Sequence, residues 1–248
     1  MVTQRLEAVL PGRILVFATG RSDWMILDEL EKKLRPPERG MPPYPPKYVV
    51  LPSGDKLVIR QATNDDIPTL LETVEPLARV RKDFYDIVAS RVYAELLGQY
   101  IHRVVDPYCL VGTIDGVVAS LVNGRMIDAK RGMSYHTLTI HRGLRCGAHM
   151  FAAKMEYHME ILGQDEVFIV AESYIGFKRW MIEYQLESRP SFQHELGGAP
   201  SYVLTRALYD TYKPRLVAGT RPVPEKLLRT ADRLILPDEY PQIPGFKR

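Results

Sequence analysis

The stretch from residue 133 to residue 162 reads MSYHTLTIHRGLRCGAHMFAAKMEYHMEIL. Its first part, Met133–His141, alternates between apolar and polar side chains, which is typical of a strand with one buried face. Arg142–Gly147 interrupts this pattern with two glycines. From Ala148 to Leu162 apolar side chains recur at helical spacing, and Gly163 ends the helix. The stretch therefore predicts a strand, a turn and a helix in succession.

The turn has the features of a phosphate site. The first amides of a helix have no acceptor within it, and the helix dipole favours negative charge there. Gly143 and Gly147 let the backbone approach a ligand without a Cβ atom, and Arg142 and Arg145 add positive charge beside the same amides. A glycine turn before a helix is equally common as a purely structural feature. The P-loop and dinucleotide-binding patterns are both missing.

Upstream, the pattern predicts two helices behind a first strand. Lys56–Ala62 alternates as a strand does, and Asn64 or Asp65 then caps a helix with apolar residues up to Leu77. A second helix is predicted from about Asp83 to Arg103.

A hairpin follows, because Asp115-Gly116 separates the apolar runs Cys109–Ile114 and Val117–Val122. Downstream, Glu166–Ala171 is a short apolar run that suits a strand buried on both faces. A helix over Tyr174–Leu186 and strands over Ser191–Leu196 and Ser201–Ala207 complete the pattern.

The element order is thus β-α-α-β-β-β, a loop, and α-β-α-β-β. One helix connects two strands that must run parallel, and the other connections are mostly antiparallel hairpins. The sequence predicts a mixed α/β (α+β) fold with a mostly antiparallel central sheet and helices on both faces.

Proline-rich segments flank this core and suggest three regions. Residues 1–50 form an N-terminal extension with a strand at Arg13–Thr19, a helix from Ser22 or Asp23 to Lys33, and an extended linker over Arg35–Lys47. Residues 51–210 form the domain, and residues 211–248 form a largely irregular tail. From Tyr212 onward eight basic side chains stand against four acidic ones. Such a tail is typical of a solvated or wrapped segment.

Composition argues against several classes of protein. The net charge of the 248 residues is only +3, which demands neither a nucleic acid nor an anionic membrane. The two cysteines form no C-x-x-C pair, and the six histidines show no metal-ligand spacing, so we expect no disulfide framework and no metal. No signal-peptide pattern and no membrane-spanning apolar run are present, which predicts a cytoplasmic protein without a membrane partner.

At the turn, Arg142-Gly143-Leu144-Arg145-Cys146-Gly147 resembles the signature of the GNAT superfamily of N-acetyltransferases. That signature is Arg or Gln, two residues, Gly, one residue, and Gly or Ala, between the fourth strand and the third helix. Arg142 and Gly147 match it, whereas Arg145 stands where the family has its first glycine. The likeness in element order covers about Leu51 to Leu208.

The resemblance implies an N-acyltransferase that takes an acyl group from acetyl-CoA or another acyl-CoA and passes it to an amine by direct attack in a ternary complex. In the family the fourth and fifth strands splay apart, and the pantetheine arm lies between them. The residues that would bind the cofactor are Leu138, Thr139, Ile140, Arg142, Gly143, Arg145, Gly147, Ala148 and Ser173.

Acyl transfer to an amine needs a base that removes the amine proton. Glu172 follows a buried strand, where its pKa would be raised, and is the first candidate; His136 or His141 is the alternative. The family's tyrosine that protonates the leaving thiolate is replaced here by Trp180, so Tyr184, one helical turn later, is the candidate acid, with Tyr174 as the alternative.

The acceptor would be a small-molecule or peptide amine. Two other functions stay open. One is a non-catalytic CoA- or ligand-binding module on the same fold, favoured by the departures at Arg145 and Trp180. The other is a nucleic-acid-associated protein, which only the basic tail favours. Proline-rich arms commonly wrap a neighbour, so the extensions favour a homodimer.

Overall fold

The computed structural model describes residues 8–10, 13–15, 40–102, 107–170, 172–173, 176, 178, 184–192 and 201–240. The chain divides into two units, Met1–Pro37 and Glu38–Arg248. In the first unit, β1 (Ala8–Leu10) and β2 (Arg13–Leu15) form an antiparallel hairpin. The helix predicted between residues 22 and 33 lies outside the described residues.

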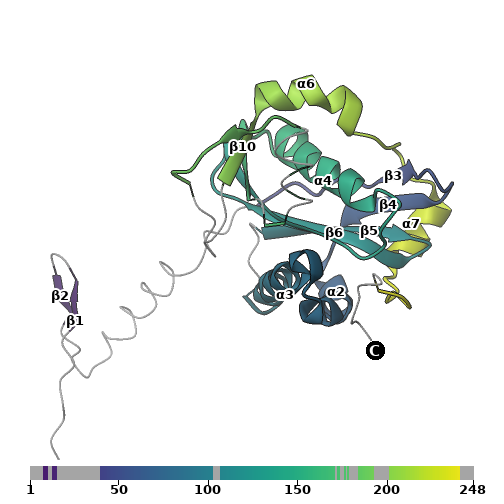
Figure 1. Cartoon of the computed structure of the whole chain (residues 1–248), viewed down its shortest axis with the longest axis horizontal. Coiled ribbons are helices and arrows are strands. Elements are labelled where there is room, and N and C mark those ends of the chain that lie inside the picture. Colours follow the sequence, from purple (N-terminus) through teal and green to yellow (C-terminus); the bar gives the residue numbers. More distant parts are fainter. Residues whose placement is uncertain are drawn as a thin grey trace, which may run out of the picture. The chain divides into compact units, whose positions relative to one another are not determined.

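The second unit is built on an eight-stranded sheet (Figure 1). In spatial order its strands are β3 (Lys47–Val50), β4 (Lys56–Gln61), β5 (Pro107–Ile114), β6 (Val117–Met126), β7 (Arg131–Thr139), β8 (Glu166–Val170), β10 (Ser201–Thr205) and β9 (Glu187–Ser188). Every neighbouring pair is antiparallel except β7 and β8, which are parallel. The predicted fold class is confirmed.

Helices cover both faces of this sheet (Figure 1). The helices are α2 (Ile67–Val74), α3 (Tyr85–His102), α4 (Cys146–Glu156), α6 (Arg206–Leu216) and α7 (Glu225–Asp232). The 3₁₀ turns Asn64–Asp66, Glu75–Arg79 and Lys82–Phe84 flank α2 and α3, and a π-helical turn at Tyr157–Ile161 extends α4.

Alternation along the central strands divides the core between the two faces. On one face, Leu121 and Leu138 pack with Leu70 of α2 and Leu96 of α3. On the opposite face, apolar residues of β4, β5 and β6 pack against Met150 and Ala153 of α4. The sheet therefore holds α3 and α4 on opposite sides of β7.

The ends of the domain differ from the prediction. Lys47–Val50, placed at the end of an extension, is a strand paired with β4. The tail, predicted to be largely irregular, contains α6 and α7. The predicted strand Ser201–Ala207 ends at Thr205, because the side chain of Thr205 accepts a hydrogen bond from the amide of Leu208 and caps α6.

Two further predicted elements fall mostly on residues outside the described ones. These are the helix at Tyr174–Leu186 and the strand at Ser191–Leu196. In the described part of this region, Ser191 lies in a turn, and the edge strand that pairs with β10 is Glu187–Ser188.

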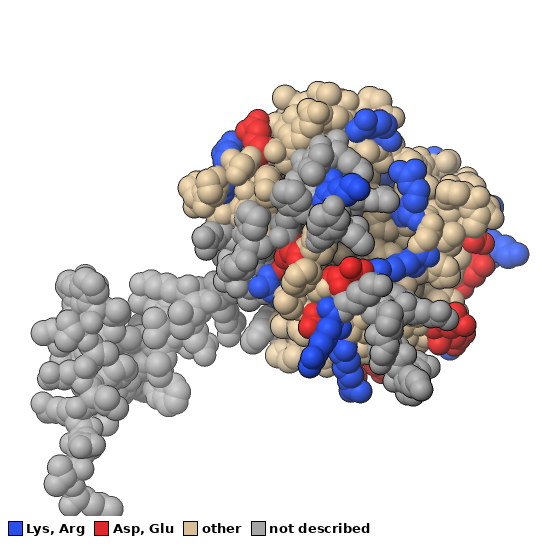
Figure 2. Space-filling view, in the orientation of Figure 1, with Lys and Arg blue, Asp and Glu red and all other residues tan. Residues whose placement is uncertain are grey.

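Two basic residues of the C-terminal segment form ion pairs with the domain. Arg221 forms an ion pair with Glu156 of α4 at 2.9 Å, and Lys213 forms one with Glu160 at 2.8 Å. Glu156 also binds the buried ammonium of Lys47 at 2.7 Å. These contacts fasten the segment to α4, as the interpretation of a wrapped tail requires. Figure 2 shows basic and acidic side chains interspersed on the face in view.

The parallel pairing of β7 with β8 is short. Its register runs from Arg131 opposite Glu166 to Ser134 opposite Ile169. β7 continues to Thr139, but β8 ends at Val170. The two strands therefore form a fork, and residues 135–139 of β7 have no strand partner on that side within the described chain.

Candidate active site

A cavity of about 290 Å³ lies where the fork meets the start of α4. Eight of the nine residues predicted to bind the cofactor line it, together with Asp83, Tyr85 and Val88 from the start of α3. The ninth, Ile140, is buried in the hydrophobic core instead. It follows the last residue of β7 and packs in the same cluster as Leu138, which does line the cavity.

Arg145 takes the backbone conformation that glycine usually supplies. It is the N-cap of α4 with φ 63° and ψ 16°, in the left-handed region. Its carbonyl accepts hydrogen bonds from the amides of Ala148 and His149 at 3.0 and 3.2 Å. The amides of Cys146 and Gly147 precede any helical acceptor and face the turn. Arg145 thus has a left-handed backbone conformation at the position where the signature has glycine.

Gly147 lies against the end of β7. A Cβ atom on Gly147 would lie 2.4 Å from Oγ1 of Thr139, a distance at which one of the two must move. Glycine at this position therefore allows the start of α4 to approach the strand closely. Gly143, with φ 92°, needs glycine for its backbone angle instead, and nothing lies within 4 Å of its Cβ position.

Arg142 connects the turn to the start of α3. Its Nε donates to the hydroxyl of Tyr85 at 2.8 Å, and its Nη1 lies 2.9 Å from Oδ2 of Asp83. The guanidinium also stacks over the Tyr85 ring, 4.5 Å from the centroid. The Tyr85 hydroxyl donates in turn to the carbonyl of Thr139 at 2.6 Å. Arg142 is thus already paired with a carboxylate at the cavity wall.

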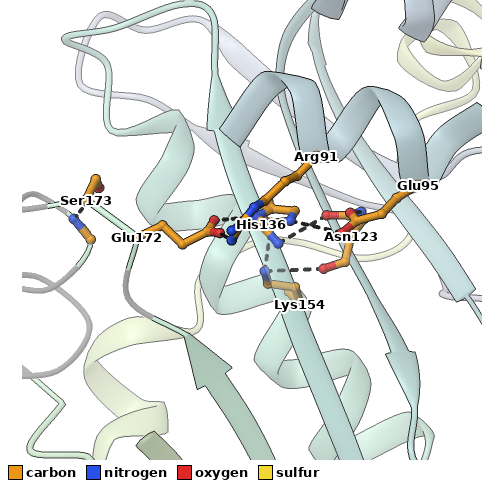
Figure 3. Close-up of polar contacts among 8 residues, drawn as sticks. Arg91, Glu95, Asn123, His136, Lys154, Glu172 and Ser173 are labelled. Carbon is orange, nitrogen blue, oxygen red and sulfur yellow. Dashed lines mark hydrogen bonds and ion pairs between the residues drawn. The ribbon is translucent and has the colours of Figure 1, made fainter. Parts of the chain in front are cut away.

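Beyond the cavity, the fork contains a cluster of charged side chains (Figure 3). The buried ring of His136, on β7, lies between two carboxylates: Nδ1 is 2.5 Å from Oε2 of Glu172, and Nε2 is 3.0 Å from Oε1 of Glu95 on α3. Arg91 of α3 forms an ion pair with the other oxygen of Glu172. Asn123 accepts from the amide of His136 at 3.1 Å and donates to Glu95.

This arrangement reverses the expected pKa shift of Glu172. Burial would raise its pKa, but the hydrogen bond and charge of His136, with the charge of Arg91, outweigh burial and lower it. Burial would likewise lower the pKa of His136, but hydrogen bonds to Glu172 and Glu95 raise it to about 9. The raised pKa expected for Glu172 is therefore wrong, and both groups are charged at neutral pH.

Lys154 belongs to the same cluster but was not predicted. Its Nζ, from α4, donates to the carbonyls of His136 at 2.8 Å and Asn123 at 3.4 Å. These carbonyls flank the register shift between β6 and β7. Burial lowers the pKa of Lys154 to about 7, although the charges of Glu95 and Glu172 oppose the shift. The signal available in the sequence was a lysine among apolar residues of a buried helix.

A second, smaller chamber of about 50 Å³ lies inside the fork, and we call it the fork chamber. Its walls include Ser134, His136, Lys154 and Glu172. It adjoins the larger cavity, because the two have lining residues in common. The shared residues are Val88, Thr137, Ser173 and Gly176.

The other predicted catalytic residues lie apart from the fork chamber. Tyr184 is buried in an apolar cluster, its ring 5.4 Å from that of Phe151, and lines neither the cavity nor the fork chamber. His141 is exposed and lines the larger cavity. Tyr174 and Trp180 lie outside the described residues.

Two negative results concern the described part of the chain. No group of His, Cys, Asp and Glu side chains in it could hold a metal ion. None of its helices is long and apolar enough to cross a membrane.

No protein-family model matches the chain, and no curated protein matches it. Among solved structures, it is similar to the GNAT domain of S. lividans PAT, with 17% identity and a TM-score of 0.47, over 64% of this chain and 96% of that one. It is also similar to PaiA N-acetyltransferase from Thermoplasma acidophilum in complex with coenzyme A, with 12% identity and a TM-score of 0.42, over 60% of this chain and 98% of that one. A third similar structure is a mutant of the spermidine N-acetyltransferase SpeG from Vibrio cholerae, with 13% identity and a TM-score of 0.44, over 62% of this chain and 95% of that one. At these values the likeness assigns no substrate, cofactor or activity to this chain.

Proposed function

We propose that this protein is an acyl-CoA-dependent N-acyltransferase, with acetyl-CoA or another acyl-CoA as donor and a small-molecule or peptide amine as acceptor. The observation that carries the proposal is that the cavity at the start of α4 adjoins the fork chamber. A cavity bounded by an open helix N-terminus leads directly into a strand fork that contains buried ionised groups. A long donor with an anionic end and a reactive end fits such a site.

The anionic end of the donor would bind at the turn before α4. The amides of Cys146 and Gly147, in the first turn of α4, would donate to a pyrophosphate there, and the helix dipole would add to the attraction. Arg145 is exposed, lines the cavity, and adds a cation. The pantetheine arm would follow β7 beyond the point where its pairing with β8 ends, past Thr137 and Leu138, which line the cavity. The thioester then lies near Thr137 and Ser173, which line both spaces.

Glu172 remains the proposed base, and His136 and Arg91 keep it ionised. As a carboxylate it holds the ammonium form of the acceptor and takes one proton from it, which frees the nitrogen lone pair to attack the thioester carbonyl. The C–N bond forms, the C–S bond breaks as the tetrahedral intermediate collapses, and a second proton from the same nitrogen passes to the sulfur, so that CoA leaves as the thiol. His136 fixes one Glu172 oxygen in place. Tyr184 as the acid would require its hydroxyl to reach a cavity that it does not line.

One observation favours the second function, a non-catalytic CoA- or ligand-binding module. Both oxygens of Glu172 already have cationic partners, Arg91 and His136. A carboxylate held in this way is a weaker base, because its cationic neighbours stabilise the charged form. The fold would then keep the donor site without turnover.

Titration calorimetry with CoA and acetyl-CoA, followed by a thiol-release assay with a panel of amines, separates the functions. Micromolar binding with thiol release that depends on an amine supports the enzyme. Binding without release from acetyl-CoA or longer donors supports the binding module. Absence of binding by every CoA compound contradicts the enzyme and a CoA-binding module, and leaves only a module that binds another ligand.

A further inference from the structure

The fork chamber contains a buried hydroxyl without a partner. Ser134 is 1% exposed, and within the described chain its Oγ has no hydrogen-bond partner. Burying an unpaired hydroxyl is unfavourable, so such groups usually mark a ligand or water position. Thr113 and Ser201 also have unpaired hydroxyls, but Ser134 lines the chamber.

Lys154 supplies a second donor to the same space. A protonated lysine has three N–H groups, and the two hydrogen bonds from Nζ of Lys154 both go to main-chain carbonyls. Its ammonium also lies 5.7 Å from the centre of the Phe151 ring, which is another wall of the chamber. Ser134 and Lys154 thus line one chamber, and an acceptor oxygen bound there, above all an anionic one, would satisfy both donors.

The position of the chamber relates it to the donor. Ser134 forms the last pair between β7 and β8, so the chamber lies at the closed end of the fork, beyond Thr137. A thioester near Thr137 would direct its acyl chain toward Ser134. A volume of about 50 Å³ exceeds the roughly 10–15 Å³ that a single water needs, so the chamber has room for the end of a short acyl chain.

We propose that the fork chamber binds the terminal carboxylate of a short acyl chain carried on CoA, with Ser134 Oγ and Lys154 Nζ as its hydrogen-bond donors. The inference rests on the proposed function and names its donor class. The charged groups that face Lys154 are Glu95 on α3, Glu172 after β8 and His136 on β7, with the thiol of Cys109 on β5. Glu172 would repel a carboxylate, but Arg91 and His136 pair with it.

The closing experiment compares two donors of similar size and branching. In malonyl-CoA the acyl chain ends in a carboxylate, and in isovaleryl-CoA two methyl groups replace the carboxylate oxygens. The full chain is titrated calorimetrically with both, and with CoA as reference. We expect malonyl-CoA to bind at least tenfold more tightly than isovaleryl-CoA, because a hydrogen bond to a charged group has about that effect. Binding at pH 8 should also take up protons, seen by comparing buffers of different ionisation enthalpy.

Variants assign the effect to the two donors. Ser134→Ala should weaken malonyl-CoA binding about tenfold and leave CoA affinity unchanged. Ser201→Ala, which removes another unpaired buried hydroxyl, is the matched control and should change neither. Lys154→Met should abolish the preference and the proton uptake. Because Lys154→Met also leaves two carbonyls without a donor, Ser134→Ala is the decisive variant.

Equal affinity for the two donors, or tighter binding of isovaleryl-CoA, overturns the inference. If CoA itself still binds in that case, the proposed function is unaffected. An equal effect of Ser134→Ala and Ser201→Ala on malonyl-CoA overturns it as well. If none of the CoA compounds binds, the proposed function fails and the inference fails with it.

Discussion

Nδ1 of His136 lies 2.5 Å from Oε2 of Glu172, although His136 is on β7 beyond its last pair with β8 and Glu172 lies beyond the end of β8. The fork allows this contact, because a paired strand would fill the space with main-chain hydrogen bonds. Figure 3 shows how Arg91 and Glu95 reach the same pair from α3. Beyond the end of β8, contacts between charged side chains thus take the place of main-chain hydrogen bonds to β7.

Replacing Glu172 by Gln should lower turnover at least 100-fold, the lower range for loss of a general base, with CoA affinity changed less than threefold. Steady-state kinetics and calorimetry measure the two quantities. Glu95→Gln is the control, because Glu95 contacts the same histidine but does not line the fork chamber. A fully active Glu172→Gln variant would exclude Glu172 as the base.

Arg145→Gly and Arg145→Ala separate the backbone from the side chain. Both remove the guanidinium, so both should lose the same factor in CoA affinity. Only Gly relieves the left-handed conformation at φ 63°, so Arg145→Gly should be more stable than Arg145→Ala by about 1 kcal/mol. Denaturant unfolding and calorimetry test this. Equal stability would argue against strain at residue 145.

Gly147→Val should weaken CoA binding tenfold or more, because the added side chain enters the close approach to Thr139 and disturbs the turn. Gly98→Val is the matched control, since nothing lies within 4 Å of a Cβ at that position of α3. Affinity and melting temperature are compared for both variants. Unchanged affinity in Gly147→Val would place the phosphate site elsewhere.

Tyr184→Phe should keep turnover within about twofold of the unmodified protein. The Tyr184 ring is buried against Phe151, and the residue lines neither the cavity nor the fork chamber. Thiol release over a range of pH measures the effect. A loss on the scale of general-acid catalysis, 100-fold or more, would restore Tyr184 as the acid.

Two buried histidines should titrate at opposite ends of the pH scale. NMR should place the pKa of His136 near 9, as its two carboxylates require, and that of His158 near 3, because burial lowers it. His136 therefore stabilises the fold fully below pH 6.5, and this contribution is lost as the pH rises through 9. The pKa of Lys154 is lowered to about 7, so its contribution to the free energy of unfolding rises with pH above 7 instead of falling.

The stability slope of His136 is isolated by comparing the protein with a His136→Gln variant in denaturant. The difference in unfolding free energy between the two should shrink from pH 6.5 to pH 9, because the folded pKa exceeds the unfolded one. A difference that is constant over this range would mean that His136 is neutral in the fold.

Several predictions from the sequence concern properties that a short window contains. The period of two in Met133–His141 and the helical spacing after Gly147 depend only on local side-chain order, and β7 and α4 follow them closely. The cofactor candidates rest on the same kind of pattern, since one strand–turn–helix segment carries all of them except Ser173, and their role stays a prediction. The homodimer and the cytoplasmic location stay predictions.

The sequence by itself determined the mixed α/β fold and the turn before α4, because periodicity and glycine placement act within a few residues of one another. Only the tertiary structure decided the chemistry of the fork. Glu95, Asn123, His136, Lys154 and Glu172 come from five separate segments, and their charges depend on the partners each finds there. Burial alone would raise the pKa of Glu172. His136 and Arg91, which lower it, are 36 and 81 positions away along the chain, so no local sequence pattern can predict their contact with Glu172.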